Sequence, residues 1–122
     1  MKVVAADWLP YCLPLRRPWQ TSRGVLNERR GRLHRLITDD GRTGWGDCAP
    51  LPEFGIDEAA ARAFAEECAS LDLAAQTAGL PLNAWLSGRA PVASVAVNAN
   101  FGPFFTVDRN SLDQAAESGF TV

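Results

Sequence analysis

The sequence predicts an α+β fold: three antiparallel strands and a long helix, followed by the first, incomplete strand–helix unit of a parallel structure. Three observations support this. An Asp-Asp-Gly-Arg turn at 39–42 joins two segments rich in β-formers, and apolar residues recur at helical spacing after residue 57. A new alternation of strand-like, helical and strand-like segments begins at residue 92. The 122 residues, 47% of them hydrophobic and 21% charged, are ordinary for a soluble globular protein.

The three predicted strands cover residues 3–15, 33–38 and 43–49. The Asp-Gly pair between the last two supplies the positive φ angles that a tight turn requires, so the three strands form a meander. Residues 16–30 are polar and contain a proline and a glycine, and we expect them to form a long loop. Loops of that length are more often functional than incidental.

The long helix follows a Pro- and Gly-containing loop at residues 50–55. Asp57 can cap it, and Gly79 with Pro81 should end it after residue 78. The helical spacing predicts a buried stripe of Ala60, Phe64, Leu71, Ala75 and Ala78. A short helical piece is expected over residues 81–86, ending at Gly88.

The last third of the chain has a different pattern. We expect a strand over residues 92–100, a helix over 111–118 and the start of a further strand at 120–122. Such an order is typical of a parallel βαβ unit, whose strands need neighbours and covering on both faces. We therefore predict two domains, 1–90 and an incomplete 91–122, cut from a longer protein.

The charges are unevenly distributed. Residues 1–46 carry nine basic and four acidic side chains, whereas residues 47–122 carry three and ten. We interpret the arginines of the first half as solvated strand faces, and as loop arginines that meet an anionic small molecule or the acidic second half. Aromatic interleaving is thin, because Trp19 is the only aromatic residue among them, so we expect no nucleic-acid partner. No apolar run approaches the roughly 20 residues that span a bilayer, so no membrane association is expected.

Other candidate chemical groups have plainer interpretations. The pattern Gly44-x-Gly46-x-x-Ala49 is followed by prolines rather than by a helix, and we interpret its glycines as strand packing. His34, the only histidine, is expected to be a surface residue. The three cysteines fit neither a disulfide framework nor a zinc site, so we expect reduced thiols, mostly buried, and a cytoplasmic protein. The acidic residues offer no convincing metal site.

A resemblance to a known family is carried by three stretches in order: RRPWQTSRG, DDGRTGWGDCAPLPEFG, and AFAEECASLDLAAQTAGLPLNAWLSG followed by SVAVNAN. Together they resemble the N-terminal capping domain of the enolase superfamily. The most similar branch is the muconate-cycloisomerase-like group, which contains o-succinylbenzoate synthases and N-acylamino-acid racemases. The resemblance implies an enolase-type cap, here shortened after residue 56, followed by a truncated βα unit of a TIM-like (β/α)7β barrel.

In this family two cap loops act as lids over the substrate. The resemblance places the first lid at residues 19–24 and the second at 51–55. It assigns substrate contacts to Trp19, Thr21, Ser22, Arg23, Gly24, Leu51, Phe54 and Gly55. Arg23 would contact a carboxylate, because a guanidinium group suits that anion. Asn98 or Asn100 would lie near the active-site end of the first barrel strand.

The implied parent reaction is a Mg²⁺-dependent dehydration that gives o-succinylbenzoate, a menaquinone precursor. N-Acylamino-acid racemisation, dipeptide epimerisation and muconate cycloisomerisation are close alternatives. The family's lysine bases and carboxylate metal ligands lie on later barrel strands, and the only lysine here is Lys2. We therefore expect no catalytic residue, no metal ligand, no cofactor and no turnover from this chain by itself. A non-catalytic module, either anion-binding or forming homo-oligomers through an exposed barrel-facing surface, is the alternative.

Overall fold

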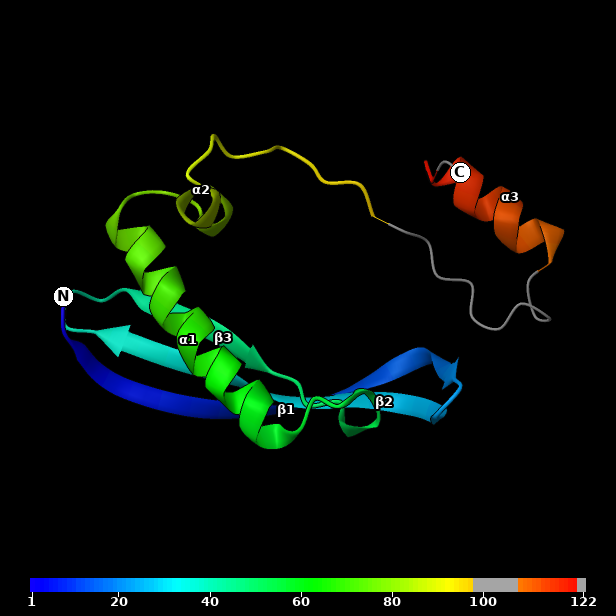
Figure 1. The fold of residues 1–122 in the computed structure, drawn as a ribbon, viewed down its shortest axis with the longest axis horizontal. Helices are drawn as coiled ribbons and strands as arrows, with labels where there is room; N and C mark the ends of the chain where they lie inside the picture. The colour runs from blue at the N-terminus through cyan, green and yellow to red at the C-terminus, as the bar shows by residue number, and fades with distance from the viewer. Residues whose placement is uncertain (98–107, 121–122) are drawn as a thin grey trace. The chain divides into compact units, whose positions relative to one another are not determined.

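The computed structural model describes residues 1–97 and 108–120 (Figure 1). The chain forms two compact units: Met1–Pro14 with Glu28–Pro91, and Leu15–Asn27 with Val92–Val122. The elements in order are β1 (Val3–Thr21), β2 (Gly24–Thr38), β3 (Thr43–Cys48), the 3₁₀ turn η1 (Pro52–Phe54), α1 (Glu58–Thr77), α2 (Leu82–Ser87) and α3 (Arg109–Glu117). Within the described part of the chain, no helix has both the length and the apolar character needed to cross a bilayer.

The predicted three-stranded meander is confirmed, with strand order β1-β2-β3. β2 and β3 pair antiparallel, with Leu33 opposite Asp47 and His34 opposite Gly46. The turn between them uses Gly41 at a φ of 83°, as the Asp-Gly pair predicts.

The long loop predicted for residues 16–30 is wrong, because β1 continues to Thr21 and β2 begins at Gly24. Two residues make the turn, and the Thr21 hydroxyl donates to the Gly24 carbonyl oxygen at 3.0 Å and accepts from the Arg23 N–H at 3.1 Å. Gly24 has a φ of 143°, which favours glycine. Proline is tolerated in β1 because this strand lies at the edge of the sheet, where a missing N–H breaks no ladder bond.

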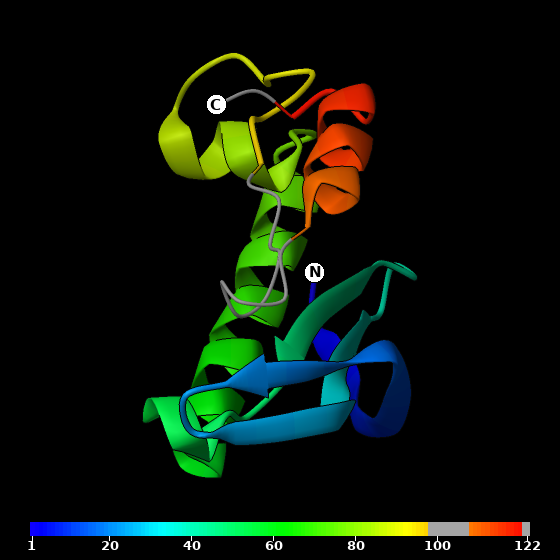
Figure 2. The ribbon, with the colours of Figure 1, turned by 90° about the vertical axis from the view of Figure 1, so that its right-hand side faces the viewer.

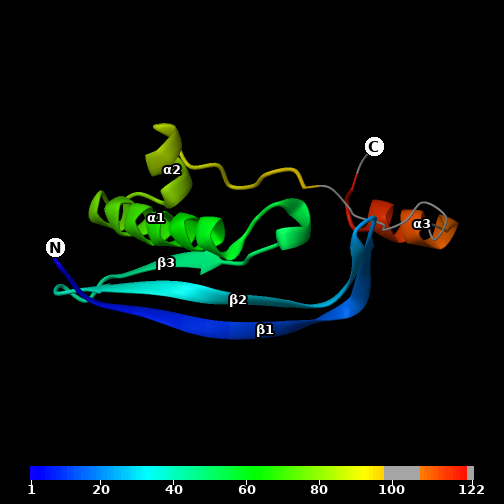
Figure 3. The same ribbon diagram turned by 60° about the horizontal axis from the view of Figure 1, so that its bottom comes forward.

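α1 packs along one face of the sheet, chiefly against β3 (Figures 2 and 3). A Cβ built on Gly46 would lie 1.9 Å from the Ala65 carbonyl oxygen, and one on Gly44 would lie 2.3 Å from that of Ala69. Helix and strand backbones therefore meet almost directly, and this confirms the interpretation of the two glycines as strand packing.

The buried stripe of α1 differs from the predicted one. Its members are mostly small residues, Ala61, Ala65, Ala69, Leu73 and Ala75, and only Ala75 was predicted. Phe64 is 64% exposed, and Ala60 and Ala78 are exposed as well. The reason is the closeness of α1 to the glycine-bearing strand, since only small side chains fit between two backbones at that separation.

His34 was expected at the surface, but it is only 6% exposed. The face of β2 that carries it is covered by α1, and its cross-strand neighbour Gly46 leaves room for an imidazole. The ring lies against Trp8, with the two ring centroids 4.3 Å apart. Arg62 of α1 places its guanidinium carbon 5.1 Å from the Trp8 ring centroid, so α1 and the two outer strand positions share one small core.

The ends of α1 follow the sequence. The Asp57 carboxylate accepts the Ala60 N–H at 2.8 Å, as a capping residue does, and Gly79 takes a left-handed φ of 69° after the last turn. Pro81 then precedes α2, which ends at Gly88 with a φ of 64°. The predicted start and stop signals of both helices are confirmed.

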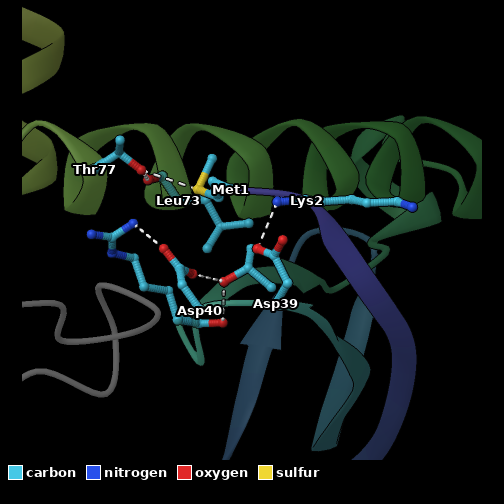
Figure 4. Close-up of polar contacts among 8 residues, drawn as sticks. Met1, Lys2, Asp39, Asp40, Leu73 and Thr77 are labelled. Carbon is cyan, nitrogen blue, oxygen red and sulfur yellow. Dashed lines mark hydrogen bonds and ion pairs between the residues drawn. The ribbon is translucent and has the colours of Figure 1, made fainter.

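The chain's N-terminus is tied to the β2–β3 turn and to the end of α1 (Figure 4). The Lys2 N–H donates to Asp39 Oδ1 at 2.9 Å. The Thr77 hydroxyl donates to the Leu73 carbonyl oxygen at 2.8 Å, and its oxygen lies 3.1 Å from Met1 Sδ. The adjacent aspartates therefore serve the turn, as their position after a strand indicates.

The predicted C-terminal helix is confirmed as α3, which Asp108 caps by accepting the Ser111 N–H at 2.7 Å. The strand predicted for residues 92–100 is not formed over 92–97, where Val95 is 73% exposed. A strand requires a neighbouring strand to bond with, and within the described residues these six have none. Residues 98–100, with Asn98 and Asn100, and residues 121–122 lie outside the described residues.

Candidate functional site

The first predicted lid is the end of the β1–β2 hairpin rather than a loop. Trp19 is in β1, Ser22 and Arg23 form the turn, and Gly24 opens β2. Thr21 is half-buried, whereas the other predicted contact residues of this lid are exposed. A hairpin end with a bonded turn is a defined surface on which a side chain such as Arg23 can be held toward a ligand.

The second predicted lid, residues 51–55, is a compact closed loop. Its ends are joined by two backbone hydrogen bonds: the Leu51 N–H donates to the Ile56 carbonyl oxygen at 2.7 Å, and the reverse bond measures 3.2 Å. Inside it, the Phe54 N–H donates to the Leu51 carbonyl oxygen at 2.9 Å. Gly55 has a φ of 81°, the left-handed conformation that closes the turn. The Phe54 side chain is exposed at the tip of this structure.

Sequence reasoning missed the contact that holds the base of the second lid. Arg29 of β2 donates from Nη1 to the Pro50 carbonyl oxygen at 2.7 Å and from Nη2 to that of Ala49 at 2.5 Å. The sequence offered no signal for it, because Arg29 is one of several arginines in β2 and its partners lie about 20 positions further along the chain.

A second polar pair crosses the open face of the sheet beside this lid. The Tyr11 hydroxyl donates to Asp47 Oδ1 at 2.8 Å, passing over Gly31 of the central strand. A Cβ on Gly31 would lie 2.3 Å from the Tyr11 hydroxyl oxygen and 2.7 Å from the Cys48 carbonyl oxygen. Glycine is therefore required there by the close approach of Tyr11, and burial, followed by the Asp47 hydrogen bond, raises the pKa of Tyr11 above 10.0.

Tyr11 is the only tyrosine, so its ionisation can be followed by ultraviolet absorbance of the intact protein. The pKa is raised in the folded state, so the stabilisation that it reflects is complete below pH 10.0 and is lost as the pH rises through the folded value. We expect a midpoint above 10.0 for the folded protein and a lower one, still above 10.0, for Asp47→Asn, because burial remains the larger cause. A wild-type midpoint equal to that of the urea-unfolded chain would contradict the burial of Tyr11.

The structure places the predicted site residues in separate settings. The first lid lies in the unit that contains Leu15–Asn27 and the second in the unit that contains Glu28–Pro91, and each is described by itself. Among residues 1–97 and 108–120, no three His, Cys, Asp or Glu side chains are grouped so that they could hold a metal ion. The three cysteines are free thiols; Cys48 is buried and Cys68 half-buried, whereas Cys12 is exposed, contrary to the expected burial.

No model of a known protein family matches the chain. Two curated relatives match part of it. One is the o-succinylbenzoate synthase of Thermosynechococcus vestitus, 42% identical over 51 residues, which are 42% of this chain and 16% of that protein. The other is the hydrophobic dipeptide epimerase of Roseobacter litoralis, 37% identical over 87 residues, which are 70% of this chain and 25% of that protein. The match thus spans a quarter or less of either relative.

Two solved structures share the fold. The L-Ala-D/L-Glu epimerase of Bacillus subtilis aligns with a TM-score of 0.58 and 22% identity, over 67% of this chain and 33% of that one. A dipeptide epimerase of Cytophaga hutchinsonii, complexed with magnesium and D-Ala-L-Val, aligns with a TM-score of 0.56 and 23% identity, over 73% and 34%. The chain therefore has a cap-type α+β fold, a three-stranded antiparallel meander with helices. Its relatives and structural neighbours are enzymes of the enolase superfamily, and the chain resembles their N-terminal cap.

Proposed function

We propose that this chain supplies the substrate-facing cap of an enolase-superfamily enzyme that acts on small carboxylates. The observation that carries the proposal is the combination of a cap-type meander and helix with 42% and 37% identity to two enzymes of that kind. The two lids, one a hairpin end and the other a closed loop, offer the surfaces that such a cap would present to its substrate.

Dehydration to o-succinylbenzoate is the favoured parent reaction, in line with the more identical of the two relatives. Epimerisation of hydrophobic dipeptides is the second candidate, favoured by the longer match; N-acylamino-acid racemisation and muconate cycloisomerisation share the same cap type. Arg23 would meet the carboxylate that these substrates have in common, and Trp19 and Phe54 would supply apolar walls. The described residues present no cluster fit for magnesium, so we assign neither that ion nor a catalytic step to them.

Two further proposals concern partners and location. The exposed apolar side chains of residues 92–97 are a surface for self-association, and light scattering that gives a monomer at all concentrations would exclude it. Free thiols favour a reducing compartment, and we propose the cytoplasm; secretion in an expressing cell would contradict this.

The test uses the purified 122-residue protein with Mg²⁺ and either the dehydration substrate or hydrophobic dipeptides. We expect no turnover from the chain alone, because the described residues hold no metal cluster and the sequence has no lysine beyond Lys2. Mixed with the Roseobacter litoralis epimerase from which its own cap has been deleted, the chain is expected to restore activity. Arg23→Ala should then raise KM about tenfold or more, as loss of a charged hydrogen bond does, whereas Arg89→Ala should not.

Turnover by the chain alone would refute its dependence on a barrel. A folded chain that restores no activity to the cap-deleted epimerase, or to the matching cap-deleted synthase, would refute the proposed cap role.

A further inference from the structure

The second lid is held to the sheet at both of its ends by arginines of β2. Before the lid, Arg29 donates to the Ala49 and Pro50 carbonyl oxygens at 2.5 and 2.7 Å. After it, Arg32 Nη1 lies 3.0 Å from Glu58 Oε1, in the first turn of α1. Because the two arginines are three positions apart in one strand, they leave it on opposite faces and reach opposite ends of the same loop.

The Arg29 contact answers a need created by the end of β3. That strand stops at Cys48, so the next two carbonyl oxygens leave the ladder without strand partners, and Pro50 has no N–H with which to continue pairing. A planar guanidinium group presents two parallel donors, which match two consecutive carbonyl oxygens in a way that an ammonium group cannot. Arg29 is also half-buried, and water competes less for these bonds than at the surface.

The two clamps are unequal. Arg32 and Glu58 are both exposed, and exposed ion pairs contribute little to stability because water and salt screen them. The lid itself is bonded internally by the two-way bridge between Leu51 and Ile56, so it can move only as a unit about its ends. The position of the whole loop, with Phe54 at its tip, therefore depends mainly on Arg29.

We propose that Arg29 is a positioning residue that fixes the second lid to the sheet, so that the apolar wall at its tip is preorganised before a ligand arrives. The link to substrate specificity rests on the proposed function; the clamp itself does not. A preorganised wall costs less ordering entropy on binding than a loop that must be arrested by the ligand.

The experiment is amide hydrogen exchange, followed by NMR, on the full 122-residue chain and three variants: Arg29→Ala, Arg29→Lys and, as the matched control, Arg30→Ala. Arg30 is exposed and pairs only with Glu28 among the described residues, so its removal deletes the same charge without touching the lid. In Arg29→Ala we expect the amides of Leu51, Phe54, Gly55 and Ile56 to exchange faster by about tenfold or more, while those of α1 and β3 keep their rates. Arg29→Lys should restore part of the protection.

Two results would overturn the proposal. Unchanged lid exchange in Arg29→Ala would show that the loop holds itself, and an equal acceleration in α1 and β3 would show a general effect on stability. Because no substrate is involved, failure of the clamp is distinguishable from failure of the proposed function. The clamp can be present in a chain that restores no barrel activity, and restored activity can accompany a lid that does not need Arg29.

Discussion

Gly46→Ala is expected to separate α1 from the sheet and to unfold the compact unit that contains them. The new Cβ would lie 1.9 Å from the Ala65 carbonyl oxygen and 2.7 Å from the Ala65 carbonyl carbon. Overpacking a core costs about 1–3 kcal/mol when side chains can rearrange, but here the obstacle is backbone and no rotamer relieves it. We expect a loss above ~3 kcal/mol, a large part of the ~5–15 kcal/mol by which domains are stable.

The measurement is urea unfolding followed by far-ultraviolet circular dichroism. Gly44→Ala should be destabilised as well, since its Cβ would meet the Ala69 carbonyl oxygen at 2.3 Å, but less than Gly46→Ala. Glu67→Ala, on the exposed side of α1, is the control and should lie within about 0.5 kcal/mol of wild type. A Gly46→Ala protein with the wild-type midpoint would mean that helix and strand do not meet as described.

The sequence predicted those features of the fold that depend on local chemistry. The Asp-Gly turn, the Asp57 cap and the Gly79 stop each have a physical cause within a few residues, and each is confirmed. The length of the hairpin was missed because polar residues and a proline indicate a loop, and only the edge position of β1 makes them compatible with a strand. His34 was missed for the same kind of reason, because its burial depends on which face of the sheet α1 covers.

The candidate site was less accessible to sequence reasoning. The lids were placed by resemblance, and neither their hydrogen bonding nor the hairpin form of the first could be derived from composition or spacing. Arg29 shows why: its contact depends on where β3 ends and on the path of the next two residues, and nothing in the strand that carries it indicates this.

The orientation of α1 was the hardest feature to predict, because its alanines occur on every face and hydrophobic spacing fits more than one phase. Phe64, the bulkiest apolar residue of the helix, suggested one phase, whereas the glycines of β3 impose another. Two truncations separate these phases directly. Leu73 is 2% exposed and Phe64 is 64% exposed, so the structure assigns them opposite roles.

Leu73→Ala is expected to lower the free energy of unfolding by about 2–5 kcal/mol, since it removes a buried side chain and leaves a cavity against β3. Phe64→Ala should change it by no more than about 0.5 kcal/mol. Urea unfolding of both variants, at two protein concentrations to separate folding from self-association, measures the difference. Equal losses, or a larger loss for Phe64→Ala, would show that α1 is rotated so that its aromatic face meets the sheet. In that case the close contact of Gly46 with Ala65 could not exist either, because both observations depend on the same helix phase.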